Sequence, residues 1–116
     1  MDLTSTHFRY LLAIYQLSKT RPEITSASVA GALRVSRPSV TRMLSILAEK
    51  DLVTKERYGK IALTERGTVL ARRQEDYVRS LVRQLPALGL DLTDQEAEEA
   101  ALALAAVLPP RCRGGL

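Results

Sequence analysis

The stretch from Ser36 to Lys50 constrains the fold most, because it has the pattern of one short helix with two unlike faces. Ser36 is a natural N-cap, and Pro38 fits the first turn, where no backbone N–H donor is needed. Apolar side chains then recur at three- and four-residue spacing, at Val40, Met43, Leu44 and Leu47. This stripe is typical of a buried helix face, so the sequence predicts a helix that begins near Arg37.

The opposite face of this helix is small, rich in hydroxyl groups and cationic, with Arg37, Pro38, Ser39, Thr41, Arg42 and Ser45. In a major groove, arginine can bridge two acceptors on guanine, serine and threonine can reach bases or phosphates, and a methyl group can contact thymine. We interpret the helix as a candidate DNA-recognition helix. An ordinary amphipathic helix with a solvated basic face is the alternative that this stretch alone leaves open.

The residues before the candidate recognition helix predict a helix-turn-helix. Residues 26–33 have the composition of a short helix, and the tight connection at residues 34–35 leads directly to Ser36. We therefore add Ser26 and Ser28 of the short helix, together with Ser36, to the predicted DNA contacts.

The residues after it predict a β-hairpin, the wing of a winged helix. Residues 51–57 and 60–64 carry alternating apolar positions on either side of the turn Tyr58-Gly59. Three side chains near the tip suit contact with a phosphate backbone or the minor groove, namely Arg57, Tyr58 and Lys60. A merely solvated hairpin is the alternative.

Three more helices complete the prediction. Thr4 or Ser5 caps a helix to about Lys19, in which His7 is expected to be a surface or capping residue, and Ile24 follows in an extended segment. Thr64 opens a long helix that Pro86 ends, with apolar positions at Val69, Leu70, Tyr77, Val78, Leu81, Val82 and Leu85. Thr93 and Glu96 form a capping box for a last helix to about Leu108.

The last helix is almost wholly apolar after Glu99, which one buried face does not explain. Small alanine side chains let helix backbones approach closely, so the helix is either sandwiched inside the chain or packed against a second subunit. We favour the second subunit and predict a homodimer whose interface includes Leu12, Leu102, Leu104, Ala105 and Leu108.

The predicted fold class is mainly α with a small β wing, in which a winged helix-turn-helix is followed by a helical dimerisation region. The predicted divisions are a DNA-binding domain at residues 1–64, the dimerisation region at 65–108 and a flexible tail at 109–116. At 116 residues the chain is long enough for one domain and an oligomerisation element, and too short for two large domains.

The charge of the chain is unevenly distributed. Residues 1–85 hold 15 Lys and Arg against 8 Asp and Glu, whereas residues 86–116 hold 2 against 5. A basic winged-helix region matches the electrostatics of nucleic-acid binding, although a basic total charge alone is weak evidence.

Other sequence features bear on the location and class of the protein. The chain has no run of about 18 apolar residues, and its single cysteine is Cys112, so we expect a cytoplasmic protein without a membrane span or a disulfide. The lone His7 and the lack of a phosphate loop or nucleophile motif argue against an enzyme.

Several of these segments together resemble the iron- and manganese-dependent repressors of the diphtheria toxin repressor family, and especially the shorter manganese transport regulators. The likeness covers roughly residues 5–108 and lies in residues 29–43, Leu52-Val53, Tyr58-Gly59, Leu63-Thr64-Glu65-Arg66-Gly67 and Leu88-Gly89-Leu90-Asp91. The resemblance implies a homodimeric transcription factor that binds a palindromic double-stranded DNA operator through its winged helix and dimerises through its C-terminal helices.

The sequence departs from that family where the family senses metal. A gapless alignment on the same landmarks places six residues without metal-binding side chains at the ligand positions, namely Arg9, Leu12, Val78, Leu102, Ala105 and Ala106. We therefore predict a sequence-specific regulator, in function a repressor, that uses no metal and no other cofactor. A winged-helix protein-interaction module without sequence-specific DNA binding is the competing hypothesis. A third, an unusual metal sensor built from His7, Cys112 and acidic residues, would need ligands from distant parts of the chain.

Overall fold

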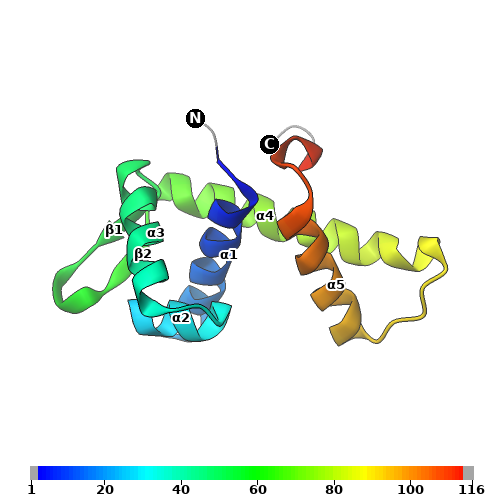
Figure 1. The fold of residues 1–116 in the computed structure, drawn as a ribbon, viewed down its shortest axis with the longest axis horizontal. Helices are drawn as coiled ribbons and strands as arrows, with labels where there is room; N and C mark the ends of the chain where they lie inside the picture. The colour runs from blue at the N-terminus through cyan, green and yellow to red at the C-terminus, as the bar shows by residue number, and fades with distance from the viewer. Residues whose placement is uncertain (1–2, 114–116) are drawn as a thin grey trace.

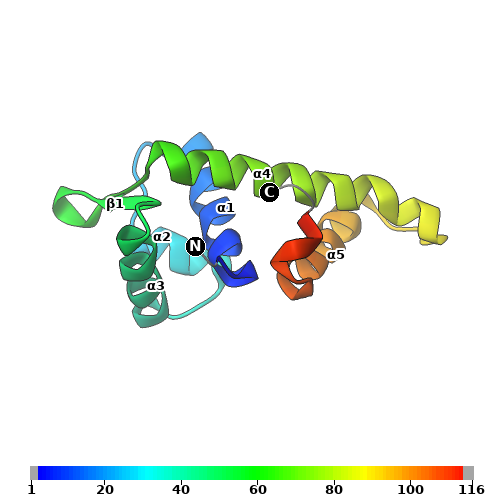
Figure 2. The same cartoon turned by 90° about the horizontal axis from the view of Figure 1, so that it is seen from above.

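Helix α4 (Glu65–Gln84) runs along the molecule, and α1 and α5 pack against it (Figures 1 and 2). The computed structural model describes residues 3–113. Its other main elements are α1 (Ser5–Thr20), α2 (Ser26–Leu33), α3 (Arg37–Glu49), β1 (Val53–Lys55), β2 (Ile61–Leu63) and α5 (Asp94–Val107). The molecule measures 48 × 28 × 22 Å, with the winged helix at one end and α5 toward the other. The predicted mainly α fold with a small β wing is confirmed.

The predicted helix starts are confirmed by side-chain caps. Ser36 is the N-cap of α3, and its hydroxyl accepts a hydrogen bond from the N–H of Ser39. Thr93 and Glu96 form the predicted capping box of α5. Each cap satisfies a backbone donor that the first helical turn leaves without a partner, so the sequence fixes where the helix begins.

His7 is a capping residue, as one of the two predicted alternatives had it, but it is buried and not on the surface. Its Nδ1 accepts a hydrogen bond from the N–H of Thr4 at 3.0 Å, so the imidazole takes the place that a glutamate fills in other capping boxes. Burial lowers the pKa of His7, and the nearby charge of Lys50 lowers it further. Both effects favour the neutral form of the ring, which can accept this bond.

The wing is shorter than predicted. Asp51 has a left-handed backbone (φ 60°), and the N–H of Leu52 donates to the carbonyl of Leu47 at the end of α3, so the first strand begins only at Val53. At the tip, Tyr58 and Gly59 are both left-handed, with φ of 62° and 73°, in a tight turn. β1 and β2 are antiparallel, with Thr54 opposite Ala62.

The expected extended segment at Ile24 is confirmed and pairs with the wing. The N–H of Ile61 donates to the carbonyl of Ile24 at 2.8 Å, and Thr25 and Lys60 form an isolated β-bridge. This pairing connects the wing to the start of α2, so the hairpin has a fixed position beside the helix-turn-helix.

Two apolar clusters hold the described part of the chain together. The larger one joins α1, α2, α3, the wing and, through Ala71, α4; its largest fully buried side chains are Leu11, Ile14, Val29, Val40, Leu44, Leu47 and Leu52. The smaller one joins α1, α4 and α5 through Leu12, Val78, Ala101 and Ala105. The first cluster shapes the winged helix, and the second attaches α5 to it.

The first part of the predicted tail contains a short helical turn. After α5, Pro110–Arg113 form a short 3-10 helix, and the carbonyl of Leu108 accepts a hydrogen bond from the hydroxyl of Ser5 at 2.8 Å. Residues 114–116 of the predicted tail lie outside the described residues. Within the described range, no helix is both long and apolar enough to cross a membrane.

Candidate nucleic-acid interface

The outward face of α3 is exposed, and hydrogen bonds connect several of its side chains. Arg37, Pro38, Thr41, Arg42 and Ser45 are exposed, while Ser39 is half-buried. The hydroxyl of Ser36 donates to that of Ser39 at 2.8 Å, and Nη2 of Arg42 donates to the same Ser39 oxygen at 3.4 Å. The predicted contact residues of this helix therefore lie together on one surface, with Ser36 and Ser39 orienting Arg42.

Lys55 links α3 to the wing. Its Nζ donates to the hydroxyl of Ser45 at 2.9 Å, while that hydroxyl donates to the carbonyl of Thr41. Our sequence prediction did not include Lys55. The available signal was its charge and its position on the strand that leads to the wing tip. This exposed ammonium places a positive charge between α3 and the hairpin.

The wing tip presents one aromatic and two basic side chains. Tyr58 is 91% exposed, which its left-handed backbone at the turn explains, and Arg57 is exposed beside it. Lys60 is different, because its Nζ lies 2.8 Å from the carboxylate of Glu23. The hydrogen bond and charge of Glu23 raise the pKa of Lys60. A phosphate would therefore compete with Glu23 for this lysine.

The two predicted contact residues on α2 are placed less favourably. The hydroxyl of Ser28 donates to the carbonyl of Thr25 at 2.8 Å and accepts from the N–H of Thr25 at 2.9 Å, so it caps α2. Ser26 is half-buried at the helix start. Both residues lie at the end of α2 that touches the wing.

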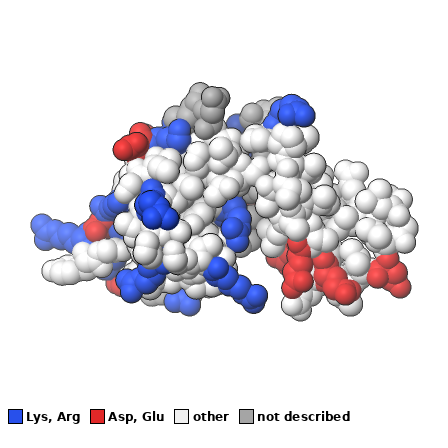
Figure 3. All heavy atoms as spheres, in the orientation of Figure 1, with Lys and Arg blue, Asp and Glu red and all other residues white. Residues whose placement is uncertain are grey.

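Figure 3 shows how charge is distributed over one face of the molecule. Lys and Arg side chains gather over the winged-helix end, and Asp and Glu side chains gather over the first half of α5. A polyanion approaching this protein would therefore be attracted to the end that carries α3 and the wing.

The residues predicted for a dimer interface divide into two groups. Leu12 and Ala105 are 3% and 1% exposed and belong to the smaller core cluster, so they have almost no surface to offer a second chain. These two side chains are buried because they pack against α4. The sequence alone did not show which face of α5 packs inside the chain. Leu102 is 39% exposed, and Leu104 and Leu108 are half-buried.

The six positions that the resemblance aligns with metal ligands do not fit a metal ion. Leu12, Val78 and Ala105 pack together in the smaller cluster, so hydrocarbon groups occupy the space between α1, α4 and α5. Arg9 lines a groove with Leu12, Leu102 and Ala106, and its guanidinium, a fixed cation, donates to the carbonyl of Leu33 at 3.1 Å. Residues 3–113 contain no group of three or more His, Cys, Asp or Glu side chains that could hold a metal.

A comparison with models of protein families shows which family this chain belongs to. Residues 2–61, about half of the chain, match the family model described as "Iron dependent repressor, N-terminal DNA binding domain". The chain belongs to the iron-dependent repressor family. The matched part ends in β2 and therefore includes α3 and the tip of the wing. It is a family of transcriptional regulators and not a class of enzymes.

Several solved structures have a similar fold, and one of them is a metal regulator. The manganese regulator SloR superimposes with a TM-score of 0.71 and is 30% identical over 90% of this chain. ZitR of Lactococcus lactis in complex with DNA gives 0.64 and 26% over 92% of the chain. The hypothetical protein SSo2273 of Sulfolobus solfataricus gives 0.68 and 25% over 96%. The chain spans 48% of SloR, 74% of the ZitR chain and 84% of SSo2273.

Proposed function

We propose that this chain is a transcriptional regulator that binds double-stranded DNA in a sequence-specific manner and acts as a repressor. The observation that carries the proposal is the exposed face of α3, where Arg37, Thr41 and Arg42 lie beside a basic wing. The ZitR structure supports it, because that relative was solved in complex with DNA.

The contacts have different roles in this proposal. Arg37 and Arg42 read base edges in the major groove, since arginine suits the two acceptors of guanine. Thr41 and Pro38 contact bases or thymine methyl groups from the same face. Lys55, Arg57 and Lys60 bind phosphates and position the protein, and Tyr58 reaches the minor groove or the backbone next to it. Ser36, Ser39 and Ser45 orient the cations, while Ser26 and Ser28 lie at the edge of the interface.

Selection of bound duplexes from a random pool tests the proposal, followed by affinity measurements with the selected sequence. We expect Arg37→Ala or Arg42→Ala to cost ~1–3 kcal/mol of binding and to relax the preference at one base position. Arg83→Ala, at the other end of the molecule on α4, is the matched control and should bind like the unmodified protein. An operator affinity that stays within twofold in both recognition-helix variants would show that α3 does not read the groove.

We also propose that the regulator is a homodimer on a palindromic operator. The support is the apolar surface of α5, on which Leu102 and Val107 are 39% and 77% exposed. Two copies joined by one symmetric interface present two α3 helices to two half-sites. Leu102, Leu104 and Leu108 belong to this interface, whereas Leu12 and Ala105 support it from the core.

DNA binding in our proposal needs no divalent metal. Apolar contacts among Leu12, Val78 and Ala105 attach α5 to α1 and α4, which is the place where the resemblance implies a metal. The burial of these side chains favours that packing without an ion. The positive charge of Arg9 would also repel a dication nearby.

The competing function is a winged-helix module that binds a protein and reads no DNA sequence. The exposed apolar surface of α5 would then be its binding surface. The random-duplex selection separates the two, because a protein-interaction module would enrich no sequence above the starting pool.

A further inference from the structure

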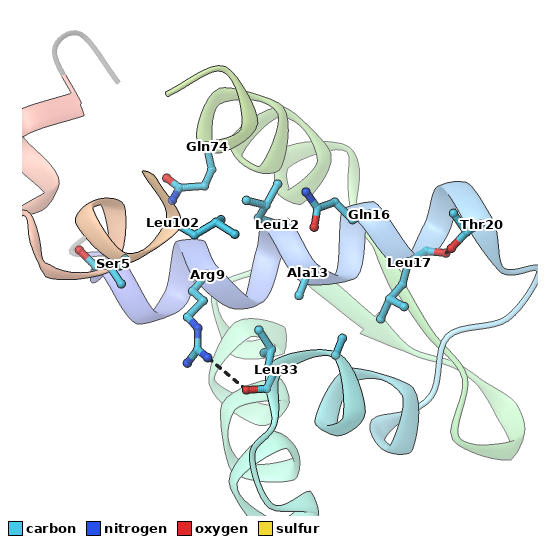
Figure 4. Close-up of a pocket in the computed structure, with 13 residues that line it drawn as sticks. Ser5, Arg9, Leu12, Ala13, Gln16, Leu17, Thr20, Leu33, Gln74 and Leu102 are labelled. Carbon is cyan, nitrogen blue, oxygen red and sulfur yellow. Dashed lines mark hydrogen bonds between the residues drawn. The ribbon is translucent and has the colours of Figure 1, made fainter. Parts of the chain in front are cut away.

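A groove runs along α1 between the end of α2 and α5, with a volume of about 620 Å³ (Figure 4). We call it the α1 groove. Its apolar walls come from three helices and consist of Leu12, Ala13 and Leu17, then Ala32 and Leu33, and then Leu102, Ala103 and Ala106. The size and the apolar lining are those of small-molecule sites, which add a few polar groups to fix the ligand.

Arg9 gives the α1 groove its charge. Among the described residues that line it, Arg9 is the one charged side chain, and the polar remainder is Ser5, Gln16, Thr20 and Gln74. No carboxylate among those lining residues offsets the guanidinium. An adjoining hollow shares Leu12, Gln16 and Leu102 but is lined by both acids and arginines, so its charge is mixed. The cation and the hydrocarbon walls together select an anion with an apolar body.

We propose that the α1 groove binds a small organic anion, a carboxylate on a hydrocarbon body, with Arg9 as its ionic partner. The guanidinium has five N–H donors in a planar fork that matches a carboxylate. One of its nitrogens, Nη2, already donates to the carbonyl of Leu33 at 3.1 Å, as the dashed line in Figure 4 shows. The hydrocarbon body lies against the leucines and alanines of α1, α2 and α5.

The hydrogen bond of Arg9 connects this site to the helix-turn-helix. Leu33 is the last residue of α2, the left-handed Arg34 follows it, and Ser36 then caps α3. A carboxylate takes the remaining N–H donors of the guanidinium, and we infer that it draws Arg9 away from the Leu33 carbonyl and so loosens the turn that sets α3. The ligand therefore lowers operator affinity. This regulatory half rests on the proposed function, whereas ligand binding itself does not.

Calorimetric titration of the full chain with decanoate, below its micelle-forming concentration, tests the binding half. We expect saturable binding of one decanoate per chain, weakened about tenfold or more by Arg9→Gln, because a charge-assisted hydrogen bond is lost. Arg9→Lys should keep most of the affinity, and Arg73→Gln, an exposed arginine of α4 outside the groove, should not change it. Decanol, which has the same chain without the charge, should bind more weakly and be indifferent to Arg9→Gln.

Two results would overturn the binding half. One is the absence of saturable decanoate binding or an equal affinity in the unmodified protein and Arg9→Gln. The other is decanoate binding that appears only as a dimer dissociates in sedimentation, which would assign the groove to a second copy of the chain.

A second experiment measures the affinity of the protein for the selected duplex with and without decanoate. We expect operator affinity to fall at least threefold in the unmodified protein and to stay constant in Arg9→Gln; an unchanged affinity in both would refute the regulatory half. Failure of the proposed function looks different, since no duplex would be selected while the calorimetric titration still reports binding.

Discussion

At Gly67 two backbone segments lie close together. A Cβ at this position would overlap the carbonyl oxygen of Leu52, and that oxygen also accepts a hydrogen bond from the N–H of Thr64. The hydroxyl of Thr64 accepts from the N–H of Gly67 and donates to the carbonyl of Asp51 at 2.7 Å. The Leu-Thr-x-x-Gly motif thus starts α4 and binds it to the segment between α3 and β1, so its glycine is needed for space and not for an unusual backbone angle.

We predict that Gly67→Ala lowers the free energy of unfolding by ~1–3 kcal/mol, because the added methyl group must push apart two packed backbones. Urea unfolding followed by circular dichroism measures this. Gly31→Ala is the matched control, since a Cβ there meets open space on the exposed side of α2. Alanine is the better helix former, so the control should be neutral or slightly stabilised. Equal unfolding midpoints for the two variants would contradict the assigned close approach.

The single-residue predictions from sequence succeeded where a side chain has one local role. Ser36, Thr64 and Thr93 all cap the helices that they were expected to open. Burial on α4 was harder to predict, because Val69 is 41% exposed whereas Gln74 is 3% exposed. Hydrophobicity alone does not show which side of an amphipathic helix meets two partners, and α4 packs against both α1 and α5.

Among the elements, the wing combines exposed cations with one that is already paired. Lys60 is bound to Glu23, whereas Arg57 and Lys55 carry no acidic partner among the ion pairs of residues 3–113. The carboxylate of Glu23 therefore reduces the positive charge that the wing offers to DNA.

We predict that Glu23→Gln strengthens binding to all duplexes alike and steepens the salt dependence, because Lys60 then neutralises a phosphate without competition. Lys60→Ala should act in the opposite direction, again without a change in sequence preference. Affinities for the selected and a scrambled duplex, measured from low to high salt, provide the test. An effect of either variant confined to the selected duplex would mean that the wing reads bases.

The elements themselves could largely be predicted from the sequence, because capping residues and apolar spacing are local signals. The hairpin is shorter than predicted because the left-handed Asp51 turns the chain so that the N–H of Leu52 bonds to α3 and not to the other strand. This contact between elements is not visible in the local sequence pattern. For α5 the sequence favoured packing against a second subunit over packing inside the chain, and the structure shows its inner face in the core. Whether the outer face binds a second chain depends on a partner, so neither local pattern nor the fold of one chain decides it.

At the scale of the whole molecule, we predict that operator binding does not depend on metal. After exhaustive chelation, affinity for the selected duplex should stay within twofold, because the contacts between α5 and α1 are hydrocarbon contacts. The comparison is with added manganese, iron or zinc in the same assay. A tenfold loss on chelation that one of these metals restores would refute metal independence and revive the unusual-sensor hypothesis.

We further predict a dimer that depends on α5. Leu104→Asp would place an unpaired charge in the interface or the core, which costs several kcal/mol, so the dimer should dissociate or the fold should fail. Sedimentation and circular dichroism distinguish these outcomes. Val69→Asp, a similar change on the half of α4 nearer the wing, is the control and should stay dimeric. A well-folded monomer of the unmodified protein at tens of micromolar would count against the dimer.

The length of α4 has a consequence for the DNA that such a dimer selects. Its 20 residues correspond to about 30 Å of helix, with the wing at one end and the α5 connection at the other. In a dimer joined through α5, this rod sets how far each α3 stands from the symmetry axis. Half-sites are read on one side of the duplex when they lie about 34–36 Å apart, and one added helical turn would move each α3 by about 5.4 Å. In the proposed dimer, we therefore expect the number of residues in α4 to affect the operator spacing, although α4 itself does not contact the bases.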